Sequence, residues 1–374
     1  MNRFHSLTSG LYRGEVSFDF VGRAKQWYIL SAVMLLIALG SLAVNGLKFG
    51  VEFSGGAVFS VPSESCEITT AREAAAAEVP EGDPIVTELN GSSGRQVKVQ
   101  TVDLTPAETG AVNQALADAC NVPLEDVSTQ VIGPSWGEQI TQKALTGLVV
   151  FLVLIVIYLS IMFEWRMAIG ALVALFHDVF ITVGIYSLSG FEVTPATVIG
   201  VLTILGYSLY DTVVVFDKVK ENTRGIQTSS RMTYSEAANL AVNQTLVRSI
   251  NTSVVGLLPV ASLLFVGAYV LGAGTLKDLA LALFVGIAVG TYSSIFIATP
   301  VLAQLKEREP AMAALAKRVN ARRSGGRDVA KGAGDGDGSG DGSADSVMTG
   351  AGSAAGSATR GPRNQPKRKA KKKR

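Results

Sequence analysis

Charged residues are scarce in this 374-residue chain, at 17% against about a quarter in a typical soluble domain. The deficit is concentrated in apolar stretches of about 20 residues, the length that a helix needs to cross the hydrocarbon core of a bilayer. Hydrophobic residues make up 48% of the chain. This composition favours a protein that crosses a membrane several times over a soluble one.

Motifs for nucleotide binding, metal binding and catalysis are also missing. No Gly-x-x-x-x-Gly-Lys-Ser/Thr loop is present, and no dinucleotide-binding glycine motif follows a predicted strand. The chain has two cysteines, and without nearby histidines they cannot complete a zinc site. We therefore expect a protein that is not an enzyme and holds no metal or cofactor. The sequence motifs indicate no energy source other than an ion gradient.

Six hydrophobic segments are predicted to be transmembrane helices. They cover residues 27–47, 144–163, 166–188, 195–217, 248–272 and 278–305. The other parts are a leading segment (1–26), a segment between the first two spans (48–143), a connection (218–247) and a disordered basic tail (306–374). No small-x-small cleavage site follows the first span, so we interpret this span as an uncleaved anchor.

The charges are distributed unevenly between the connections. Residues 49–142 contain fourteen Asp and Glu against three Lys and Arg, whereas basic residues gather before the first span, in the 218–247 connection and in the tail. Positive segments stay in the cytoplasm as a rule. Both termini and the 218–247 connection are therefore predicted to be cytoplasmic, and residues 48–143 extracytoplasmic.

The segment between the first two spans has the pattern of a small α+β domain. Its predicted elements alternate as strand, helix, strand, strand, helix and strand, at residues 51–62, 70–79, 85–89, 96–102, 105–120 and 127–132. Thr105 is placed to cap the second helix, with proline at the first helical position and Glu108 three residues after the cap. This order is that of a ferredoxin-like domain.

Both cysteines lie in this predicted domain. Cys66 follows the first strand and Cys120 ends the second helix, and these two points meet at one edge of a βαββαβ fold. A disulfide between them is geometrically reasonable on the oxidising side of a membrane. The alternative is two free thiols that pack as small hydrophobic side chains.

Ionisable residues interrupt the predicted spans. Asp211 lies in the fourth span, where a carboxylate costs about 3 kcal/mol on insertion scales and commonly serves a proton relay, an ion site or a buried partner. His177 and Asp178 interrupt the third span, and Arg248 begins the fifth. If Asp211 alternates between a desolvated environment and contact with Arg248, it binds and releases a proton as the helices move. The alternative is a static Asp211–Arg248 pair that only locks two helices.

Other residues of the fourth span surround Asp211. Tyr207 and Ser208 share its helix face, so we expect them to hydrogen-bond its carboxyl group. Gly200 and Gly206 are expected to allow close approach of a neighbouring helix.

Four stretches of the chain closely resemble the signature of the SecF family. They are Gly206-Tyr-Ser-Leu-Tyr-Asp-Thr-Val-Val-Val-Phe-Asp-Lys-Val-Lys-Glu-Asn222, Phe176-His-Asp178, Asn243-Gln-Thr-Leu-Val-Arg-Ser-Ile-Asn-Thr-Ser253 and Glu52-Phe53-Ser54-Gly55-Gly56. Two positions depart from the family pattern, because Glu52 stands where Asp is usual and Tyr210 where Asn is common. The resemblance runs from the first span to about residue 305.

This resemblance implies one six-helix half of an assembly related to the RND transporters, in the bacterial cytoplasmic membrane. The family implies a SecD-like partner and use of the proton gradient to help preproteins leave the SecYEG channel. Carried over by motif, Asp211 and Arg248 would be proton-pathway residues, with His177 and Asp178 as weaker candidates. Whether the coupling ion is H⁺ or Na⁺ stays open.

Alternatives to this function are an RND-type exporter of lipid or small molecules and a scaffold that transports nothing. The tail adds a further open question, because it ends in a basic run from Lys367 to Arg374. Such a run can bind anionic lipid headgroups or ribosomal RNA by charge alone, or remain solvated.

Overall fold

The computed structural model describes residues 17–62, 66–79, 82–91, 94–229, 231–270 and 274–332. The chain divides into two units, residues 1–323 and residues 324–374. Of the second unit only residues 324–332 are described, as the end of helix α13 (Pro310–Gly332). The tail predicted to be disordered from residue 306 is instead helical at its start, in the last residues of α12 (Thr299–Glu307) and in α13, because Pro310 suits the first helical position and good helix formers follow it. The rest of the tail, with the basic run at 367–374, lies outside the described residues.

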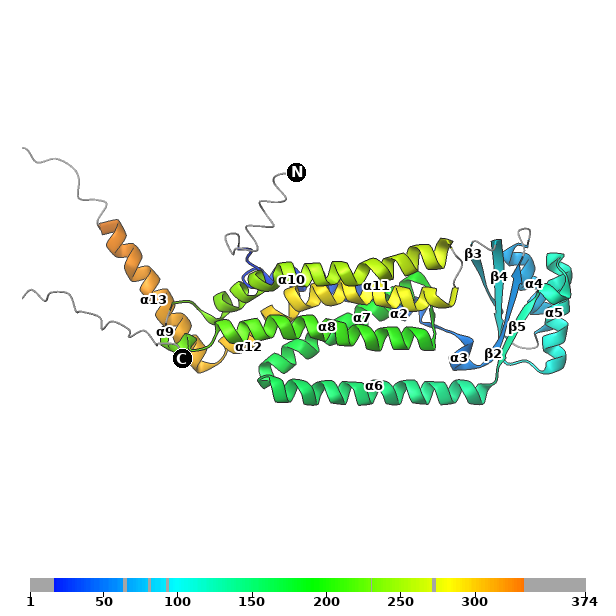
Figure 1. Ribbon diagram of the computed structural model, residues 1–374, viewed down its shortest axis with the longest axis horizontal. Coiled ribbons are helices and arrows are strands. Elements are labelled where there is room, and N and C mark those ends of the chain that lie inside the picture. The colour runs from blue at the N-terminus through cyan, green and yellow to red at the C-terminus, as the bar shows by residue number, and fades with distance from the viewer. Residues whose placement is uncertain are drawn as a thin grey trace, which may run out of the picture. The chain divides into compact units, whose positions relative to one another are not determined.

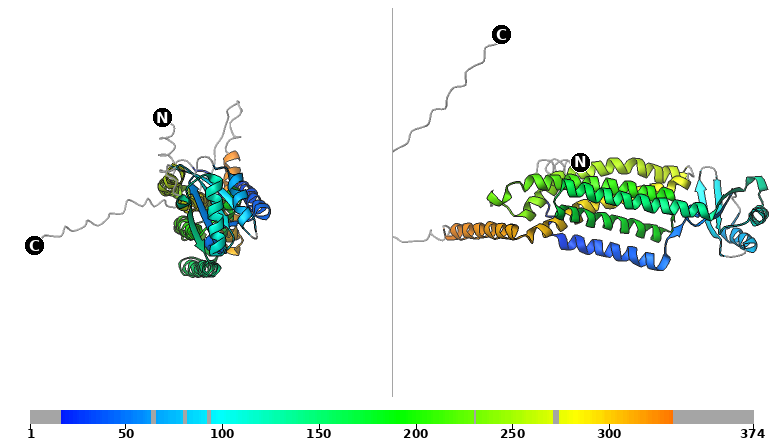
Figure 2. Two further views of the ribbon diagram at one scale, coloured as in Figure 1. Left: turned by 90° about the vertical axis from the view of Figure 1, so that its right-hand side faces the viewer. Right: turned by 90° about the horizontal axis from the view of Figure 1, so that it is seen from below.

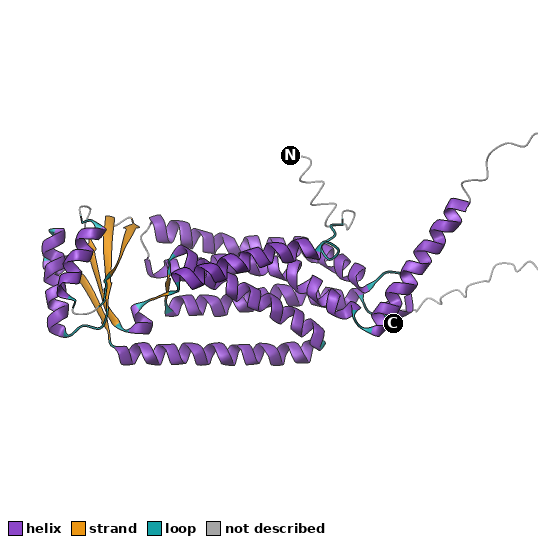
Figure 3. Cartoon of the chain, turned by 180° about the vertical axis from the view of Figure 1, so that it is seen from behind, coloured by secondary structure: helices purple, strands orange, loops and turns teal. Residues whose placement is uncertain are grey.

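Long helices form most of the first unit (Figure 1, Figure 3). They are α2 (Ala24–Asn45), α6 (Pro134–Met162), α7 (Trp165–Ser189), α8 (Pro195–Asn222), α10 (Tyr234–Ser262) with its π-helical continuation η2 (Leu263–Val270), and α11 (Gly274–Ser293), which runs through the π-helical η3 (Ser294–Ala298) into α12 (Thr299–Glu307). Within the described ranges, six helical segments are long and apolar enough to cross a bilayer.

Two of these helices begin well before the predicted spans. Helix α6 begins at Pro134 rather than near residue 144, since proline suits the first helical position. Helix α10 begins at Tyr234 rather than near residue 248, because Thr233 and Glu236 form a reciprocal capping box. A short helix, α9 (Ile226–Ser229), lies between α8 and α10. Helical structure therefore extends beyond the apolar segments that the sequence marks out.

Helix α8 lies at the centre of the bundle and packs against α7, α10 and α11. Small residues let the helices approach closely. A Cβ at Gly200 would lie 2.9 Å from the Ala282 Cβ, and one at Gly184 would lie 2.1 Å from the Ala38 Cβ. A Cβ at Gly206 would meet nothing within 4 Å, so the expected close approach occurs at Gly200 and not at Gly206.

A small sheet domain (residues 56–132) is inserted between α2 and α6. It contains β2 (Gly56–Pro62), α4 (Ile68–Glu78), β3 (Ile85–Gly91), β4 (Gly94–Thr101), α5 (Pro106–Cys120), the 3₁₀ turn η1 (Leu124–Asp126) and β5 (Ser128–Ile132). The strands are antiparallel in the order β3-β4-β2-β5, and α4 and α5 cover one face (Figure 1, Figure 2). The predicted fold class, six membrane helices with one ferredoxin-like domain, is confirmed.

The core of the sheet domain follows the period of two that strands require. Phe59 and Val61 of β2 and Val97 and Val99 of β4 are fully buried, and Leu116 of α5 packs with them.

The ends of helix α5 are held by the features expected from the sequence. Thr105 and Glu108 form the capping box, and the hydrogen bonds that Glu108 accepts from the backbone and hydroxyl of Thr105 lower the pKa of its carboxyl group. Cys66 and Cys120 are joined by a disulfide, with their Cα atoms 4.8 Å apart.

The strand predicted at residues 51–62 begins only at Gly56. Residues Val51–Ser54 form a one-turn helix, α3, after a short strand β1 (Lys48–Phe49) that pairs in parallel with β6 (Glu192–Val193). Gly55 and Gly56 have φ values of +76° and +133°, which side-chain-bearing residues rarely adopt. A Cβ at Gly56 would lie 2.2 Å from the Thr101 carbonyl oxygen, so this glycine pair serves the turn into β2 and its packing.

Candidate functional site

Two carboxyl groups are buried in the helical bundle, on neighbouring helices. Asp178 of α7 is 1% exposed and Asp211 of α8 is 7% exposed. The Ser208 and Ser293 hydroxyls donate to Oδ2 of Asp178, at 2.6 and 2.8 Å. Hydroxyl groups from neighbouring helices therefore hold this carboxyl group.

The carboxyl group of Asp211 has the same kind of surroundings. The Ser249 hydroxyl of α10 donates to Oδ1 at 2.6 Å, and the Ser294 hydroxyl donates to Oδ2 at 2.5 Å. Ser293 and Ser294 are adjacent, so one point of the last membrane helix contacts both acids. Helix α11 becomes π-helical at this point, and such bulges are frequent at functional sites.

Serine hydroxyls suit a carboxyl group that changes its protonation state. A hydroxyl group donates to a carboxylate, and it can rotate to accept from a protonated carboxyl group. The site can therefore keep its hydrogen bonds while a proton arrives or leaves. Among the described residues no group of three or more His, Cys, Asp or Glu is placed to bind a metal.

His177 lies next to the first acid. Its Nδ1 is 3.1 Å from Oδ1 of Asp178, and its ring is 5.9 Å from that of Tyr292. The Nε2 atom is buried and has no hydrogen-bond partner within the described part of the chain. A hydrogen bond from His177 to a backbone carbonyl group is not found among the described residues.

The predicted contact between Asp211 and Arg248 does not form in the described structure. Arg248 is exposed, and its Nη2 donates to the hydroxyl group of Tyr210 at 3.2 Å. The neighbouring Ser249 takes the place next to Asp211 instead. Successive residues of a helix differ by about 100° in direction, so Arg248 points away from the acid when Ser249 faces it.

The expected hydrogen bonds from Tyr207 and Ser208 to Asp211 are also absent from the hydrogen bonds of the described residues. The Tyr207 hydroxyl donates to the Thr252 carbonyl oxygen at 2.8 Å, and Ser208 reaches Asp178. Side chains that share a helix face can still turn to different neighbouring helices. The sequence indicated the right helix face but not the acid that Ser208 serves.

Three serines of the site were missed in the sequence: Ser249, Ser293 and Ser294. A signal was present, because two consecutive hydroxyl residues interrupt the sixth apolar span between Tyr292 and Ile295. Nothing in the sequence shows that they reach two different helices.

The remaining residues of the family motifs have structural roles. Glu52 lies in the first turn of α3, and the Phe53 ring packs edge-on against Phe49. Gly137 of α6 packs on this turn, since a Cβ there would lie 2.7 Å from the Phe53 carbonyl oxygen. The Asn243 side chain accepts from the Phe18 backbone N–H at 2.8 Å and holds the leading segment on α10.

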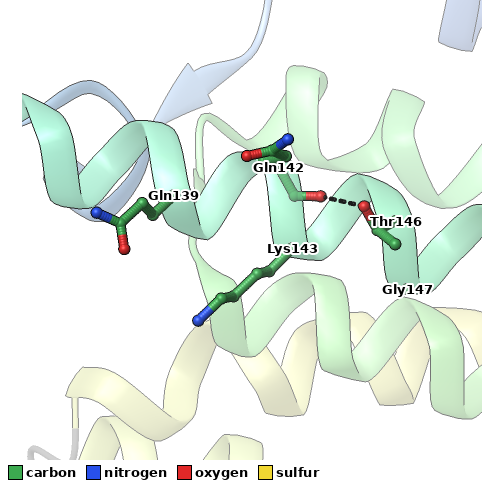
Figure 4. A pocket seen from close by; sticks show the side chains of 5 residues that line it. All are labelled: Gln139, Gln142, Lys143, Thr146 and Gly147. Atoms are coloured by element: carbon green, nitrogen blue, oxygen red, sulfur yellow. Dashed lines mark hydrogen bonds between the residues drawn. The ribbon is translucent and has the colours of Figure 1, made fainter.

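A hollow outside this site lies on α6 (Figure 4). It has a volume of about 410 Å³ and is lined by Gln139, Gln142, Lys143, Thr146 and Gly147. The Thr146 hydroxyl donates to the Gln142 carbonyl oxygen at 2.8 Å. All five residues come from one helix, and none of them is among the buried acids or their partners.

Comparisons with known proteins identify the family of the chain. The family "Protein export membrane protein SecD/SecF, C-terminal" matches residues 111–308, and the "SecD/SecF GG Motif" matches residues 40–65. SecF of Streptomyces coelicolor is 53% identical over 332 residues, which cover 89% of this chain and 88% of that protein. The chain belongs to the SecF family.

Other SecF-family relatives support this assignment. SecF of Mycobacterium tuberculosis H37Rv is 44% identical over 329 residues, covering 86% of this chain and 74% of that protein. The crystal structure of SecDF from Thermus thermophilus superposes with a TM-score of 0.68 at 30% identity, and the match covers 81% of this chain. This chain spans 42% of that SecDF chain. The SecF-family chain is a multi-pass membrane protein with an accessory role in Sec protein export.

Proposed function

We propose that this SecF-family chain uses the proton-motive force, together with a SecD-like partner, to assist preproteins at the SecYEG channel. The observation that supports this most directly is the pair of buried acids, Asp178 and Asp211, which accept hydrogen bonds from the adjacent residues Ser293 and Ser294. Ionisable groups at such depth are costly, so a chain that keeps two of them has a use for their charge.

The partner is suggested by the relatives. The Thermus thermophilus SecDF protein is 33% identical to this chain, which covers only 40% of it. The rest of such a protein leaves room for a second, SecD-like half. Arg248 and Tyr210 lie together on an exposed part of α8 and α10, so Arg248 is available to a partner subunit. Its place in the proton pathway then depends on the assembled complex.

The charge distribution and the disulfide support the proposed orientation. Basic residues before α2 and after α8 favour a cytoplasmic location for both termini in a bacterial cell membrane. The Cys66–Cys120 bridge fits the oxidising, extracytoplasmic side. Binding of the 367–374 run to anionic lipid or ribosomes stays a prediction.

Protons suit this site better than sodium ions do. Asp178 is hydrogen-bonded to one imidazole and two hydroxyl groups, and Asp211 to two hydroxyl groups. Hydroxyl and imidazole groups pass protons readily, whereas a sodium ion requires several oxygen ligands around one point. Export measured at constant pH with and without sodium distinguishes the two ions.

The test is export into inverted membrane vesicles that carry Asp211→Asn or Asp178→Asn chains with the SecD-like partner. Each variant should lose the part of export that depends on the proton gradient and keep the part driven by ATP alone. Asp217→Asn is the matched control, because Asp217 is exposed on the same helix as Asp211. If gradient-dependent export persists in both acid variants, a scaffold role is favoured.

An RND-type exporter of lipid or small molecules would also use buried acids. Co-purification with a SecD-like chain, and export of preproteins that falls with Asp211→Asn, argue against that alternative.

A further inference from the structure

A cavity of about 520 Å³ lies beside His177, between α2, α7 and the η3–α12 segment. Most of its lining is apolar, but Tyr28, Ser31, His177 and Gln304 contribute polar groups. Each water molecule takes about 30 Å³ in the liquid, so the cavity has room for several.

Two buried polar atoms of the lining residues have no hydrogen-bond partner in the described part of the chain. They are Nε2 of His177 and the hydroxyl oxygen of Tyr28. Unpaired polar groups are costly at membrane depth and are normally satisfied by protein or water. Both residues line the same cavity, so a turn of either side chain would bring its polar atom to water inside it.

The imidazole ring connects this cavity to the acids. His177 lines the cavity, and its Nδ1 is 3.1 Å from Oδ1 of Asp178. Asp178 in turn accepts from Ser293, whose neighbour Ser294 donates to Asp211. Groups that bind protons thus lie in order from the cavity to the second acid, but no hydrogen bond between the Ser293 and Ser294 hydroxyls is found among the described residues. The other titratable groups around the ring are Tyr28 of α2 and Tyr292 of α11.

The cavity lies toward one end of the bundle. Tyr28 is near the beginning of α2 (Ala24–Asn45), and Gln304 is near the end of α12 (Thr299–Glu307). Both helix ends belong to the side that the charge distribution predicts to be cytoplasmic. The cavity is therefore placed between the acids and that side.

We propose that this cavity is a water-filled route by which protons pass between His177–Asp178 and the cytoplasm. This inference rests on the proposed function, because it names the route that serves the same acids. The alternative occupant is a lipid acyl chain, which would pack against the apolar walls and keep water away from His177.

Cysteine labelling tests for water. The only two cysteines of the chain are bonded to each other, so an introduced cysteine is the single free thiol. Ala32→Cys and Val301→Cys line two walls of the cavity, whereas Ile29→Cys is a control on a 65% exposed position of α2 outside the lining. In inverted vesicles containing the SecD-like partner, a charged methanethiosulfonate should modify both lining variants about tenfold faster than the control, because a thiol must ionise to react.

A second measurement asks whether the water carries protons. Modification of Ala32→Cys after folding should abolish gradient-dependent export, and removal of the label with a reductant should restore it. Unmodified wild-type vesicles given the same reagents should keep their activity, which controls for the Cys66–Cys120 bridge.

Two results would overturn the proposal. Labelling of the lining variants as slow as that of Ile29→Cys would mean a dry or lipid-filled cavity. Fast labelling that leaves gradient-dependent export unchanged would mean a wet cavity that is not on the route. In either case, if Asp211→Asn abolishes gradient-dependent export, the proposed function still stands. If gradient-dependent export persists in Asp211→Asn, the proposed function is wrong.

Discussion

Replacing Glu192 with glutamine should loosen the sheet domain from the loop that joins α7 and α8. Oε2 of Glu192 accepts from Nζ of Lys98 at 2.9 Å and from Nε2 of Gln100 at 2.7 Å. Both donors come from β4 of the sheet domain, and the loop connects the two helices that carry the buried acids. This contact is therefore placed to transmit helix movement to the domain.

The expected size of the effect follows from burial. The side chains of Lys98 and Glu192 are 24% and 14% exposed, so water screens the pair only in part. A hydrogen bond to a charged group contributes about 1.5–3 kcal/mol, and partial solvation favours the lower end. Glu192→Gln keeps an acceptor for Gln100 and loses the charge. We expect a cost of about 1.5–2 kcal/mol, which is a shift of about 10- to 30-fold toward the undocked state.

The assay is a distance distribution between spin labels on Ala119→Cys of α5 and Asp217→Cys of α8, measured in the purified complex. Both positions are exposed. Glu192→Gln should broaden the distribution toward longer distances, and the charge exchange Lys98→Glu with Glu192→Lys should recover part of the docked population.

A matched control exists in the same sheet. Arg95 and Glu88 form a 2.9 Å ion pair within the sheet domain, each 28% exposed, so Glu88→Gln should leave the distribution unchanged. The reasoning is refuted if Glu192→Gln gives the wild-type distribution, or if the charge exchange is as poorly docked as the two single variants combined.

Three further predictions concern stability. Replacing Cys66 and Cys120 with serine should lower the free energy of unfolding of the sheet domain by about 4 kcal/mol, because the bridge joins residues 54 apart in sequence. Pulse proteolysis of the full chain in urea measures this free energy. A loss below about 1 kcal/mol would contradict the prediction. Gly184→Leu should destabilise the bundle by about 1–3 kcal/mol in thermal unfolding, since a Cβ there would lie 2.1 Å from an alanine Cβ of α2, whereas Gly206→Leu enters open space and should be tolerated. The pKa of Glu108 is lowered in the folded state, so the stability that its carboxylate contributes is present above the unfolded pKa of about 4 and is lost as the pH falls through the folded pKa. Glu108→Gln should remove this part of the acid dependence of unfolding. Equal acid dependence in the variant and the wild-type protein would argue against this reasoning.

Local patterns in the sequence were sufficient for the fold class. Apolar stretches of bilayer length marked six spans because hydrocarbon excludes unpaired backbone groups, and a helix satisfies them within one segment. The alternation of β4 and the Thr105–Glu108 cap likewise depend on neighbours in sequence. The glycines at 55 and 56 were visible, but the one-turn helix α3 before them was not, since four residues carry no periodicity.

The partners of the buried acids were decided by tertiary structure alone. Hydropathy located Asp211 and Asp178. It could not show that Ser293 donates to Asp178 while Ser294 donates to Asp211, or that Arg248 faces outward to Tyr210. Side-chain contacts across helices depend on the rotation of each helix about its axis. Moving one residue along a helix changes the direction of the side chain by about 100°. Only the packing of the whole bundle sets the rotation of each helix and so the direction that each side chain faces.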